Sequence, residues 1–260
     1  MRAGYGTPDD EVEIEAVRLK ALTDSRDRRT LRIVDRIGIA PGAACLEVGA
    51  GSGTISRALA ERVGAAGRVL SVDKDLRFHQ EMPANVEVRG IDLISEELPV
   101  GEFDFVHARA VLQHIPERDE VFVRLAAALR PGGHLLIEDS DMRAFAEQPL
   151  PEPFGSVHRL LARGTVTPWR DPNFGSRLVD AFSRAELVDI GLDGSSGLMR
   201  PNHPSGEWWL LALDRMIPRV VESGGLPEDQ AAECRTQMRH PDLVMLGPLM
   251  VSVWGRRPVG

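Results

Sequence analysis

Three glycines within residues 46–54 (Leu-Glu-Val-Gly-Ala-Gly-Ser-Gly-Thr) carry the clearest chemical signal in the chain. Gly49, Gly51 and Gly53 lie where an apolar run, typical of a buried strand, gives way to a helical pattern. Glycine lets the backbone turn tightly and approach a ligand that a side chain would exclude. A dinucleotide site requires GxGxxG, but Thr54 occupies the sixth position here. The segment predicts a ligand loop of another kind, with a tight turn that binds nothing as the alternative.

Acidic residues stand at regular places around this loop. Glu47 precedes the first glycine by two residues, where a carboxylate would attract a cation. Asp73 closes the apolar run 69–72 and lies 20 residues after the last glycine, the distance that a helix and a return strand require. Asp92 follows the third predicted strand and is also a common turn residue. Both acids are therefore expected at strand ends, and a turn role is open for Asp92.

An acidic residue followed by GxGxG, with later acids at strand ends, resembles the class I S-adenosylmethionine-dependent methyltransferases over residues 41–140. Within that superfamily the chain is similar to bacterial small-molecule and natural-product enzymes with helical caps. The resemblance implies a Rossmann-like core, S-adenosylmethionine as cofactor and S-adenosylhomocysteine as product. It implies that Asp73 binds the ribose hydroxyls and that Asp92 meets the adenine amino group. The implied cofactor-binding residues are Glu47, Gly49, Ala50, Gly51, Gly53, Asp73, Lys74, Asp92, Leu93 and Arg109.

The segment 103–114 fits the fourth strand of this family, whose end lines the reaction centre. It contains no Asn or Asp followed by two prolines and an aromatic residue, the pattern of enzymes that methylate DNA or protein glutamine. A net charge of -8 and a pI near 5.4 also oppose a nucleic-acid partner, which requires a basic surface. We therefore expect a small-molecule acceptor. Arg109 has three open roles: a contact to the cofactor carboxylate, a contact to the acceptor, or an ion pair.

Methyl transfer depends mainly on alignment and on the exclusion of water, because the sulfonium methyl is already activated. A hydroxyl acceptor also needs a base. His114, His158 and His203 are the predicted base or orienting groups, with a structural or surface role as the alternative for each. O-methylation is slightly preferred, with N- or C-methylation as the alternative. The residues predicted to contact the acceptor are Asp141, Arg143, Trp169 and Trp208.

Strands and helices alternate from residue 41 onward, as a doubly wound α/β fold requires. Such alternation predicts a mostly parallel sheet covered on both faces, and the resemblance implies seven strands. Strands are predicted at 44–48, 68–72, 86–89, 103–107 and 134–138, and later near 187–199 and 244–254. Helices are predicted at 54–63, near 75–81, from Pro116 to the Pro-Gly-Gly at 131–133, and at 174–186, 208–221 and 228–238. Two helices are expected before the first strand, the second capped by Asp24 or Ser25 and stopped by Gly38.

The 260 residues are expected to form one methyltransferase domain. Residues 1–40 would form an N-terminal helical lid, 41–140 the cofactor-binding core, 141–173 and 201–242 the lid and acceptor insertions, and 174–200 and 243–260 the late core elements. Aromatic residues gather in or beside the insertions, where they line an acceptor pocket or form the lid's own core. They are Phe145, Phe154, Trp169, Phe174, Trp208 and Trp209.

Several classes of protein are excluded by composition. The chain has no apolar stretch of about 18 residues and no apolar leader, so we expect a cytoplasmic protein without membrane contact. Cys45 and Cys234 stand far apart, which opposes a disulfide scaffold and a metal site. A short-chain dehydrogenase needs a tyrosine four residues before a lysine, but the single tyrosine is Tyr5, expected outside the core. A noncatalytic cofactor-binding partner protein stays an alternative, and a homodimer stays open.

Overall fold

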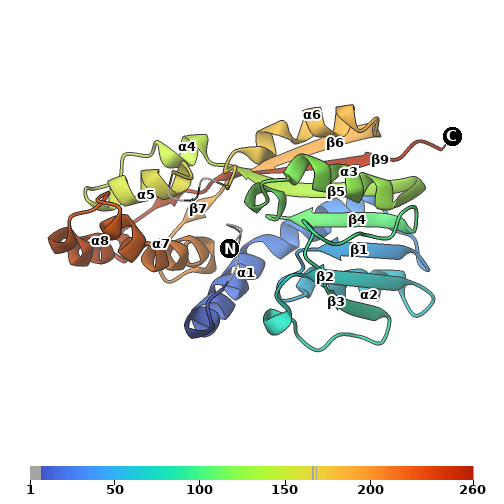
Figure 1. Ribbon diagram of the computed structural model, residues 1–260, viewed down its shortest axis with the longest axis horizontal. Helices are drawn as coiled ribbons and strands as arrows, with labels where there is room; N and C mark the ends of the chain where they lie inside the picture. The colour runs from blue at the N-terminus through green and yellow to red at the C-terminus, as the bar shows by residue number, and fades with distance from the viewer. Residues whose placement is uncertain (1–6, 166, 168, 260) are drawn as a thin grey trace.

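A seven-stranded sheet forms the centre of the protein, in the order β3-β2-β1-β4-β5-β9-β6. The computed structural model describes residues 7–165, 167 and 169–259 (Figure 1); Tyr5 lies outside them. The strands are β1 (Ala44–Val48), β2 (Arg68–Asp73), β3 (Val86–Gly90), β4 (Phe103–Arg109), β5 (Leu129–Asp141), β6 (Val188–Ser195) and β9 (Leu249–Arg256). Neighbours from β3 to β5 pair in parallel, whereas β9 is antiparallel to both β5 and β6. The predicted doubly wound, mostly parallel fold is confirmed.

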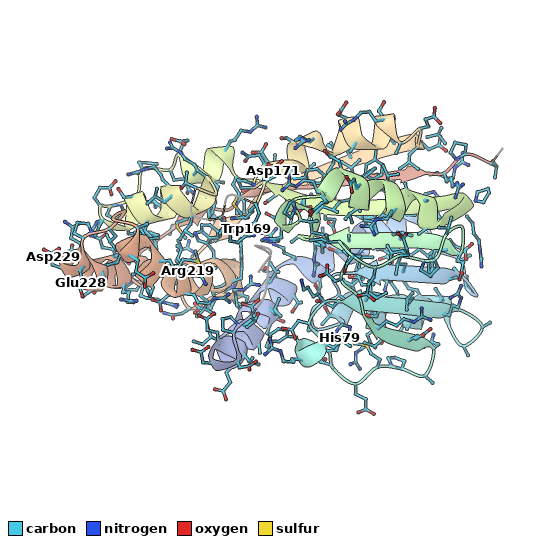
Figure 2. All side chains as sticks on the ribbon, viewed as in Figure 1. His79, Trp169, Asp171, Arg219, Glu228 and Asp229 are labelled. Carbon is cyan, nitrogen blue, oxygen red and sulfur yellow. The ribbon has the colours of Figure 1, made fainter. Side chains whose placement is uncertain are left out.

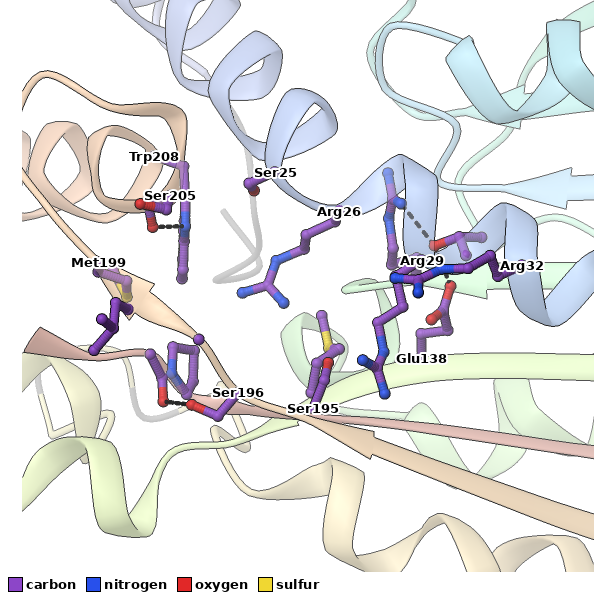
Figure 3. A pocket seen from close by; sticks show the side chains of 17 residues that line it. Ser25, Arg26, Arg29, Arg32, Glu138, Ser195, Ser196, Met199, Ser205 and Trp208 are labelled. Carbon is purple, nitrogen blue, oxygen red and sulfur yellow. Dashed lines mark hydrogen bonds between the residues drawn. The ribbon is translucent and has the colours of Figure 1, made fainter.

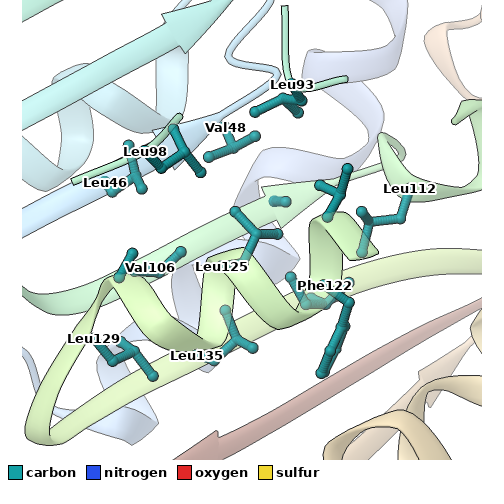
Figure 4. Packing of buried hydrophobic residues seen from close by; sticks show 14 of the residues in the cluster. Leu46, Val48, Leu93, Leu98, Val106, Leu112, Phe122, Leu125, Leu129 and Leu135 are labelled. Carbon is teal, nitrogen blue, oxygen red and sulfur yellow. The ribbon is translucent and has the colours of Figure 1, made fainter. Parts of the chain in front are cut away.

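Helices cover both faces of this sheet. On one face, Ile33 of α1 (Val12–Ile37) and Leu59 of α2 (Thr54–Val63) pack on Phe105. On the other, Phe122 of α3 (Arg118–Ala128) and Phe182 of α6 (Leu178–Arg184) join the larger apolar cluster (Figure 4). The central strands are covered on both faces, and all five residues of β1 are buried. This two-sided burial fixes the strand ends that carry the polar residues described below.

A separate helical cap extends from the sheet on the left of Figure 1. It contains α4 (Arg143–Ala146), α5 (Phe154–Ala162), α7 (Pro204–Glu222), α8 (Ala231–Met238) and the short pair β7 (Leu198–Met199) and β8 (Met245–Leu246). These elements share an apolar cluster that includes Phe145, Phe154, Trp208 and Trp209, so four of the six insertion aromatics form the cap's own core. Phe174, in contrast, belongs to the cluster against the sheet.

The two helices expected before β1 are one continuous helix, α1, so that expectation was wrong. The predicted cap residue Asp24 instead pairs with Lys20 one turn earlier, at 2.6 Å. Tertiary packing holds the two halves of α1 at different places: Ala21 joins the cap cluster, whereas Val34 joins the cluster against the sheet. Gly38 ends the helix with a φ of 77°, as its position predicted. α1 therefore spans the junction between cap and sheet.

Some other helices and strands begin or end at different residues from those expected. The helix predicted near 75–81 is a single 3-10 turn, Leu76–Phe78. The Pro-Gly-Gly segment at 131–133 was expected to end a helix, but α3 already ends at Ala128 and β5 runs through these residues, with a shift of register against β4. No helix among the described residues is long and apolar enough to cross a membrane. In the same part of the chain both cysteines are buried free thiols, and no cluster of potential metal ligands occurs.

Candidate cofactor and acceptor site

The glycine loop follows β1 directly and adopts a conformation that suits glycine. Gly49, Gly51 and Gly53 have φ values of 65°, 56° and 77°, a region that side chains disfavour. The amides of Gly49 and Ala50 both donate to the Val72 carbonyl, at 2.9 and 3.1 Å, which fixes the loop against β2. The amide of Gly51 donates to Asp73 Oδ2 at 2.7 Å. The predicted loop and the predicted strand-end acid are thus in direct contact.

The loop leaves room for a ligand above Gly51. A Cβ placed on Gly51 would meet only Leu19 Cδ2, at 3.9 Å, so a side chain there would occupy open space. The neighbouring Ser52 Oγ is buried and has no hydrogen-bond partner among the described residues. Val111 and Met82 fill the corresponding space at Gly49 and Gly53, so the open position is Gly51 alone. Its free backbone face, beside an unpaired hydroxyl and an acidic side chain, suits a polar group of a ligand such as S-adenosylmethionine.

Asp73 and Asp92 lie at the ends of neighbouring strands. Asp73 ends β2, and Asp92 comes two residues after Gly90, which ends β3 and is paired with Asp73 in the sheet. Asp92 Oδ2 accepts from Lys74 Nζ at 2.8 Å, and its Oδ1 accepts from the Ile94 amide at 3.0 Å. Asp92 therefore has the turn role that was its alternative. Its contact to adenine stays a prediction, and so does the cofactor contact of buried Leu93.

His79 is a residue near the loop that sequence reasoning missed (Figure 2). Its Cδ2 would lie 3.5 Å from a Cβ on Gly53, and its Nε2 lies 2.9 Å from Ser71 Oγ. His79 Nδ1 is buried without a partner among the residues described, and burial lowers the pKa of the ring. A single histidine in a loop gave no sequence signal for this position.

A buried chain of three ionisable side chains crosses the central strands. Glu47 on β1 lies opposite His107 on β4, and His107 Nδ1 donates to Glu47 Oε2 at 2.7 Å. His107 Nε2 lies 3.1 Å from Oε1 of Glu138 on β5. Burial opposes the charged ring, but the charge of Glu47 and the bonds to both carboxylates raise the pKa of His107 to about 9. Glu47, the acid of the first motif, is therefore held by a histidinium in addition to any ligand.

Glu138 is fully engaged by this chain. Its Oε1 also accepts from Thr30 Oγ1 at 2.6 Å, and its Oε2 accepts from Ser252 Oγ at 2.6 Å. Although burial raises the pKa of a carboxyl, the bond and charge of His107 lower that of Glu138 to about 2. Sequence reasoning missed His107 and Glu138, because strand alternation alone does not say which polar side chains meet across three strands.

Arg109 adopts the ion-pair role among its three predicted options. It ends β4, where its Nη2 donates to Asp27 at 2.6 Å and its Nη1 to Thr30 Oγ1 at 2.8 Å. Both partners lie on α1. Arg109 thereby ties α1 to the strand end beside the loop, and its contact to cofactor or acceptor stays a prediction.

A second polar cluster lies at the ends of β4 and β5 on the cap side. The amide of Gln113 donates to Asp139 Oδ2 at 3.3 Å, and Gln113 Oε1 accepts from Ser140 Oγ at 3.0 Å and from Arg170 Nη2 at 3.1 Å. Asp139 Oδ1 is buried and has no hydrogen-bond partner among the described residues. Burial raises the pKa of Asp139 to about 8. Sequence reasoning named the neighbouring Asp141 and Arg143 as acceptor contacts, but the raised pKa of Asp139 depends on burial that the sequence does not reveal.

The three predicted histidines lie in different surroundings. Burial, together with the charges of Arg170, Arg18 and Arg118, holds the pKa of His114 well below its usual value, so its ring is neutral. His158 lies inside the cap, where Nδ1 accepts from Trp209 Nε1 at 3.2 Å and Nε2 donates to the Phe145 carbonyl at 2.7 Å.

His203 is exposed and caps α7 by accepting from the Ser205 amide at 3.1 Å. These contacts bring only His114 to the strand ends and favour the structural alternatives for His158 and His203.

The four predicted acceptor residues do not form one group. Asp141 and Arg143 pair with each other, and the Arg143 side chain is 67% exposed. Trp169 lies between cap and core, where its carbonyl accepts from Arg118 at 2.6 Å (Figure 2). Trp208 lines a cavity of about 230 Å³ between α1, α7 and the strands β5, β6 and β9 (Figure 3). Acceptor contacts of all four stay predictions.

Comparison with known proteins decides the family of the chain. The model of the family described as "Methyltransferase domain" matches residues 22–191. The chain belongs to this methyltransferase family. Nocamycin O-methyltransferase of Saccharothrix syringae is 28% identical over 182 residues, which are 61% of this chain and 64% of the relative. Trans-aconitate 2-methyltransferase of Variovorax paradoxus is 30% identical over 190 residues, which are 72% of this chain and 67% of the relative.

A solved phosphoethanolamine N-methyltransferase 2 of Haemonchus contortus, in complex with S-adenosylhomocysteine, shares the fold of this methyltransferase. Its TM-score is 0.55 at 20% identity, covering 89% of this chain and 52% of that one. Membership of this methyltransferase family agrees with the predicted cofactor S-adenosylmethionine and product S-adenosylhomocysteine, which are bound in two solved structures of that Haemonchus contortus enzyme. The chain aligns with only 26% and 48% of the lengths of two further curated methyltransferases.

Proposed function

We propose that the protein transfers the methyl group of S-adenosylmethionine to a small-molecule acceptor, an intermediate of natural-product metabolism, with oxygen preferred over nitrogen or carbon. The observation that carries the proposal is the bond from the Gly51 amide to Asp73, which joins a ligand loop to the acid expected at the ribose. The net charge of -8 supports a small acceptor over nucleic acid. The names of the nocamycin and trans-aconitate enzymes, which describe small acceptors, support the same class.

The chain's own residues would position the reactants and manage one proton. S-adenosylmethionine, when bound, supplies an electrophilic methyl group. Gly49 to Gly53 and Asp73 would hold the cofactor at the ends of β1 and β2, while the cap excludes water from the ends of β4 and β5. Asp139, buried with one oxygen unpaired, would take the proton of a hydroxyl acceptor once ionised.

His114 is the second candidate for this proton. Its ring is neutral and can accept a proton, but the surrounding arginines make it a weak base. His158 and His203 stay candidates from sequence, although their present bonds serve the cap and α7. An amine or an activated carbon acceptor needs no such base, and this is the condition under which the N- or C-methylating alternatives apply.

Calorimetry with S-adenosylhomocysteine and with NADH tests the cofactor part of the proposal, and release of S-adenosylhomocysteine with a panel of phenols, carboxylic acids and amines tests the acceptor part. We expect binding of S-adenosylhomocysteine and none of NADH. A folded protein that does not bind S-adenosylhomocysteine contradicts the proposal. Methyl label transferred to RNA or DNA, with salt-sensitive binding, contradicts the small-molecule class.

A further inference from the structure

The cavity beside Trp208 is lined by an excess of basic side chains (Figure 3). It lies where α1, α7 and the ends of β5, β6 and β9 meet. Its arginines are Arg26, Arg29, Arg32 and Arg109, and Glu138 is its one acidic lining residue. Both oxygens of Glu138 already accept hydrogen bonds from His107, Thr30 and Ser252, so this carboxylate supplies one nearby negative charge but no direct ion pair to the four arginines. In a chain with a net charge of -8, such a pocket is an unusual place for four guanidinium groups.

Arg26 has no carboxylate partner among the described residues and, of the cavity's arginines, is the one that lies over the Trp208 ring. Arg29 pairs with Asp193 at 2.8 Å, and Arg109 pairs with Asp27 at 2.6 Å. Among the described residues no ion pair or hydrogen bond of Arg26 occurs, and its Nε is buried without a partner. Figure 3 shows the guanidinium pointing from α1 into the cavity towards Trp208, whose ring centre lies 5.0 Å away. A cation held on an aromatic face keeps its outer N–H groups available for an anion.

The charge of Arg26 persists at neutral pH despite its surroundings. Burial and the nearby charge of Arg109 lower the pKa of Arg26 to about 10, which still leaves the guanidinium protonated. A guanidinium that is desolvated without a direct ion pair is costly, and a bound anion would offset part of that cost. A planar fork of N–H donors matches the oxygens of a carboxylate or phosphate.

The cavity extends along the sheet away from the cofactor residues. Gly51, Asp73 and Asp92 follow β1, β2 and β3, whereas the cavity is lined from Arg109 at the end of β4 and then from β5, β6 and β9. Adjacent strands are about 4.8 Å apart, so β9 lies roughly 14 Å from β1 across the sheet. The cavity therefore extends away from the ribose and adenine side and towards the acceptor side.

We propose that this cavity binds a carboxylate or phosphate group of the methyl acceptor, with Arg26 as the anion ligand and the Trp208 ring beside the apolar body of the molecule. The proposal rests on the proposed function, because it names the chemical class of the acceptor. Met199 and Met250 line the same cavity and offer an apolar wall for that body. Ser195 and Ser205 supply further hydroxyls at its edge.

Calorimetry on the full chain with benzoate, phenyl phosphate and the neutral analogue benzamide tests this directly, without cofactor. We expect the wild-type chain to bind at least one of the two anions about tenfold or more tightly than benzamide, since a charge-assisted pair is worth that much. Which anion binds more tightly distinguishes a carboxylate site from a phosphate site. Equal binding of benzamide and both anions overturns the proposal.

Three variants separate Arg26 from general charge. Arg26→Gln is expected to lose about tenfold or more in affinity for the anion, and Arg26→Lys, which keeps the charge without the fork, is expected to lose less. Arg28→Gln removes the same charge from the same helix at an exposed position outside the cavity and is expected to bind as wild type. Wild-type anion binding by folded Arg26→Gln overturns the proposal.

An NMR titration of the wild-type chain tests the proposal even if Arg26→Gln does not fold. The indole N–H signal of Trp208, identified by its loss in Trp208→Phe, is expected to shift on titration with benzoate or phenyl phosphate. An unchanged Trp208 signal at saturating anion overturns the proposal.

Saturating S-adenosylhomocysteine is expected to leave anion binding unchanged, and competition between them would assign the cavity to the cofactor and overturn the proposal. If the anion binds but S-adenosylhomocysteine does not, the proposed function fails and the anion site stands. If only S-adenosylhomocysteine binds, this inference alone fails.

Discussion

The proposed cofactor half and the proposed acceptor half of the site are built in opposite ways. The cofactor half uses residues close in sequence, from Glu47 to Asp92, and is fixed by backbone bonds such as those from Gly49 and Ala50 to Val72. The acceptor half gathers side chains from Ser25 to Met250 around one cavity and from Gln113 to Arg170 around Asp139. In the proposed site, cofactor binding would depend on a local motif, whereas acceptor choice would depend on how distant segments pack.

The two halves also differ in charge, and one histidine connects them. Acidic side chains follow β2 and β3 in the cofactor half, while arginines dominate the cavity in the acceptor half. His107 bonds to Glu47 on the cofactor side and to Glu138 on the acceptor side. If the comparison is correct, variants in each half should change different measurements, and a variant of His107 should change the stability of the whole fold.

The largest effect is expected from Asp139→Asn in the acceptor half. If Asp139 takes the acceptor proton, this variant lowers kcat by about 10²–10⁴-fold while S-adenosylhomocysteine still binds. The base acts when ionised, so wild-type kcat should rise with pH through about 8, the pKa to which burial raises Asp139, and the rise should vanish in the variant. A rise centred below pH 6.5 that survives in Asp139→Asn but not in His114→Ala would assign the proton to His114 instead.

His107→Gln should destabilise the fold by about 3–5 kcal/mol, because it leaves two buried carboxylates without their cation. The folded pKa of about 9 lies above the unfolded value near 6.5, so the stabilisation from His107 is complete below pH 6.5 and is lost as pH rises through 9. This loss is on the order of 3 kcal/mol. Urea unfolding at pH 6 and pH 9 gives the free energy of unfolding of the wild type and of His107→Gln. The pH dependence of the difference between the two proteins measures this loss, because Asp139 contributes equally to both.

His134→Gln, a partly buried histidine on β5, serves as the control for the substitution itself. His134→Gln should not reduce the difference in the free energy of unfolding between pH 6 and pH 9. Equal pH dependence of wild type and His107→Gln would show that the buried chain of charges does not link the halves.

Gly51→Val should reduce the affinity for S-adenosylhomocysteine by more than about 100-fold. The valine side chain would enter the space above the loop, and the φ of 56° adds roughly 1–3 kcal/mol of strain. Gly42→Val is the matched control, because Gly42 has a φ of 83° with nothing within 4 Å of a Cβ. Both variants should lose stability, but only Gly51→Val should lose binding. Normal binding by a folded Gly51→Val would make the loop purely structural.

Asp73→Ala should weaken the binding of S-adenosylhomocysteine by about 2 kcal/mol, or roughly 30-fold in affinity, because a charge-assisted hydrogen-bond acceptor is removed. Calorimetry measures this change, and Asp75→Ala, two residues further along and paired with Arg77, provides a comparison outside the predicted contacts. The cavity beside Arg26 should bind its anion as before in Asp73→Ala, since it extends along the sheet away from Asp73. Unchanged cofactor affinity would remove Asp73 from the site.

Much of the fold was predictable because its signals are local. Strand β1, the glycine loop and α2 follow from one segment whose apolar run, positive φ values and helical period act within a few residues of each other. Asp73 was predictable for the same reason, since its position depends on the lengths of one helix and one strand. The single helix α1 was not, because packing at two distant sites overrides the break that Asp24 and Ser25 suggested.

By itself the sequence determined the fold class, the cofactor loop and the acid that bonds to it, because backbone geometry and side-chain period act over short distances. Only the tertiary structure decided that His107 is charged, that Asp139 retains its proton near neutral pH, and that Arg26 points into a cavity beside Trp208. Each of these depends on burial and on charges brought together from distant parts of the chain, and a pKa or an unpaired cation exists only once those neighbours are in place.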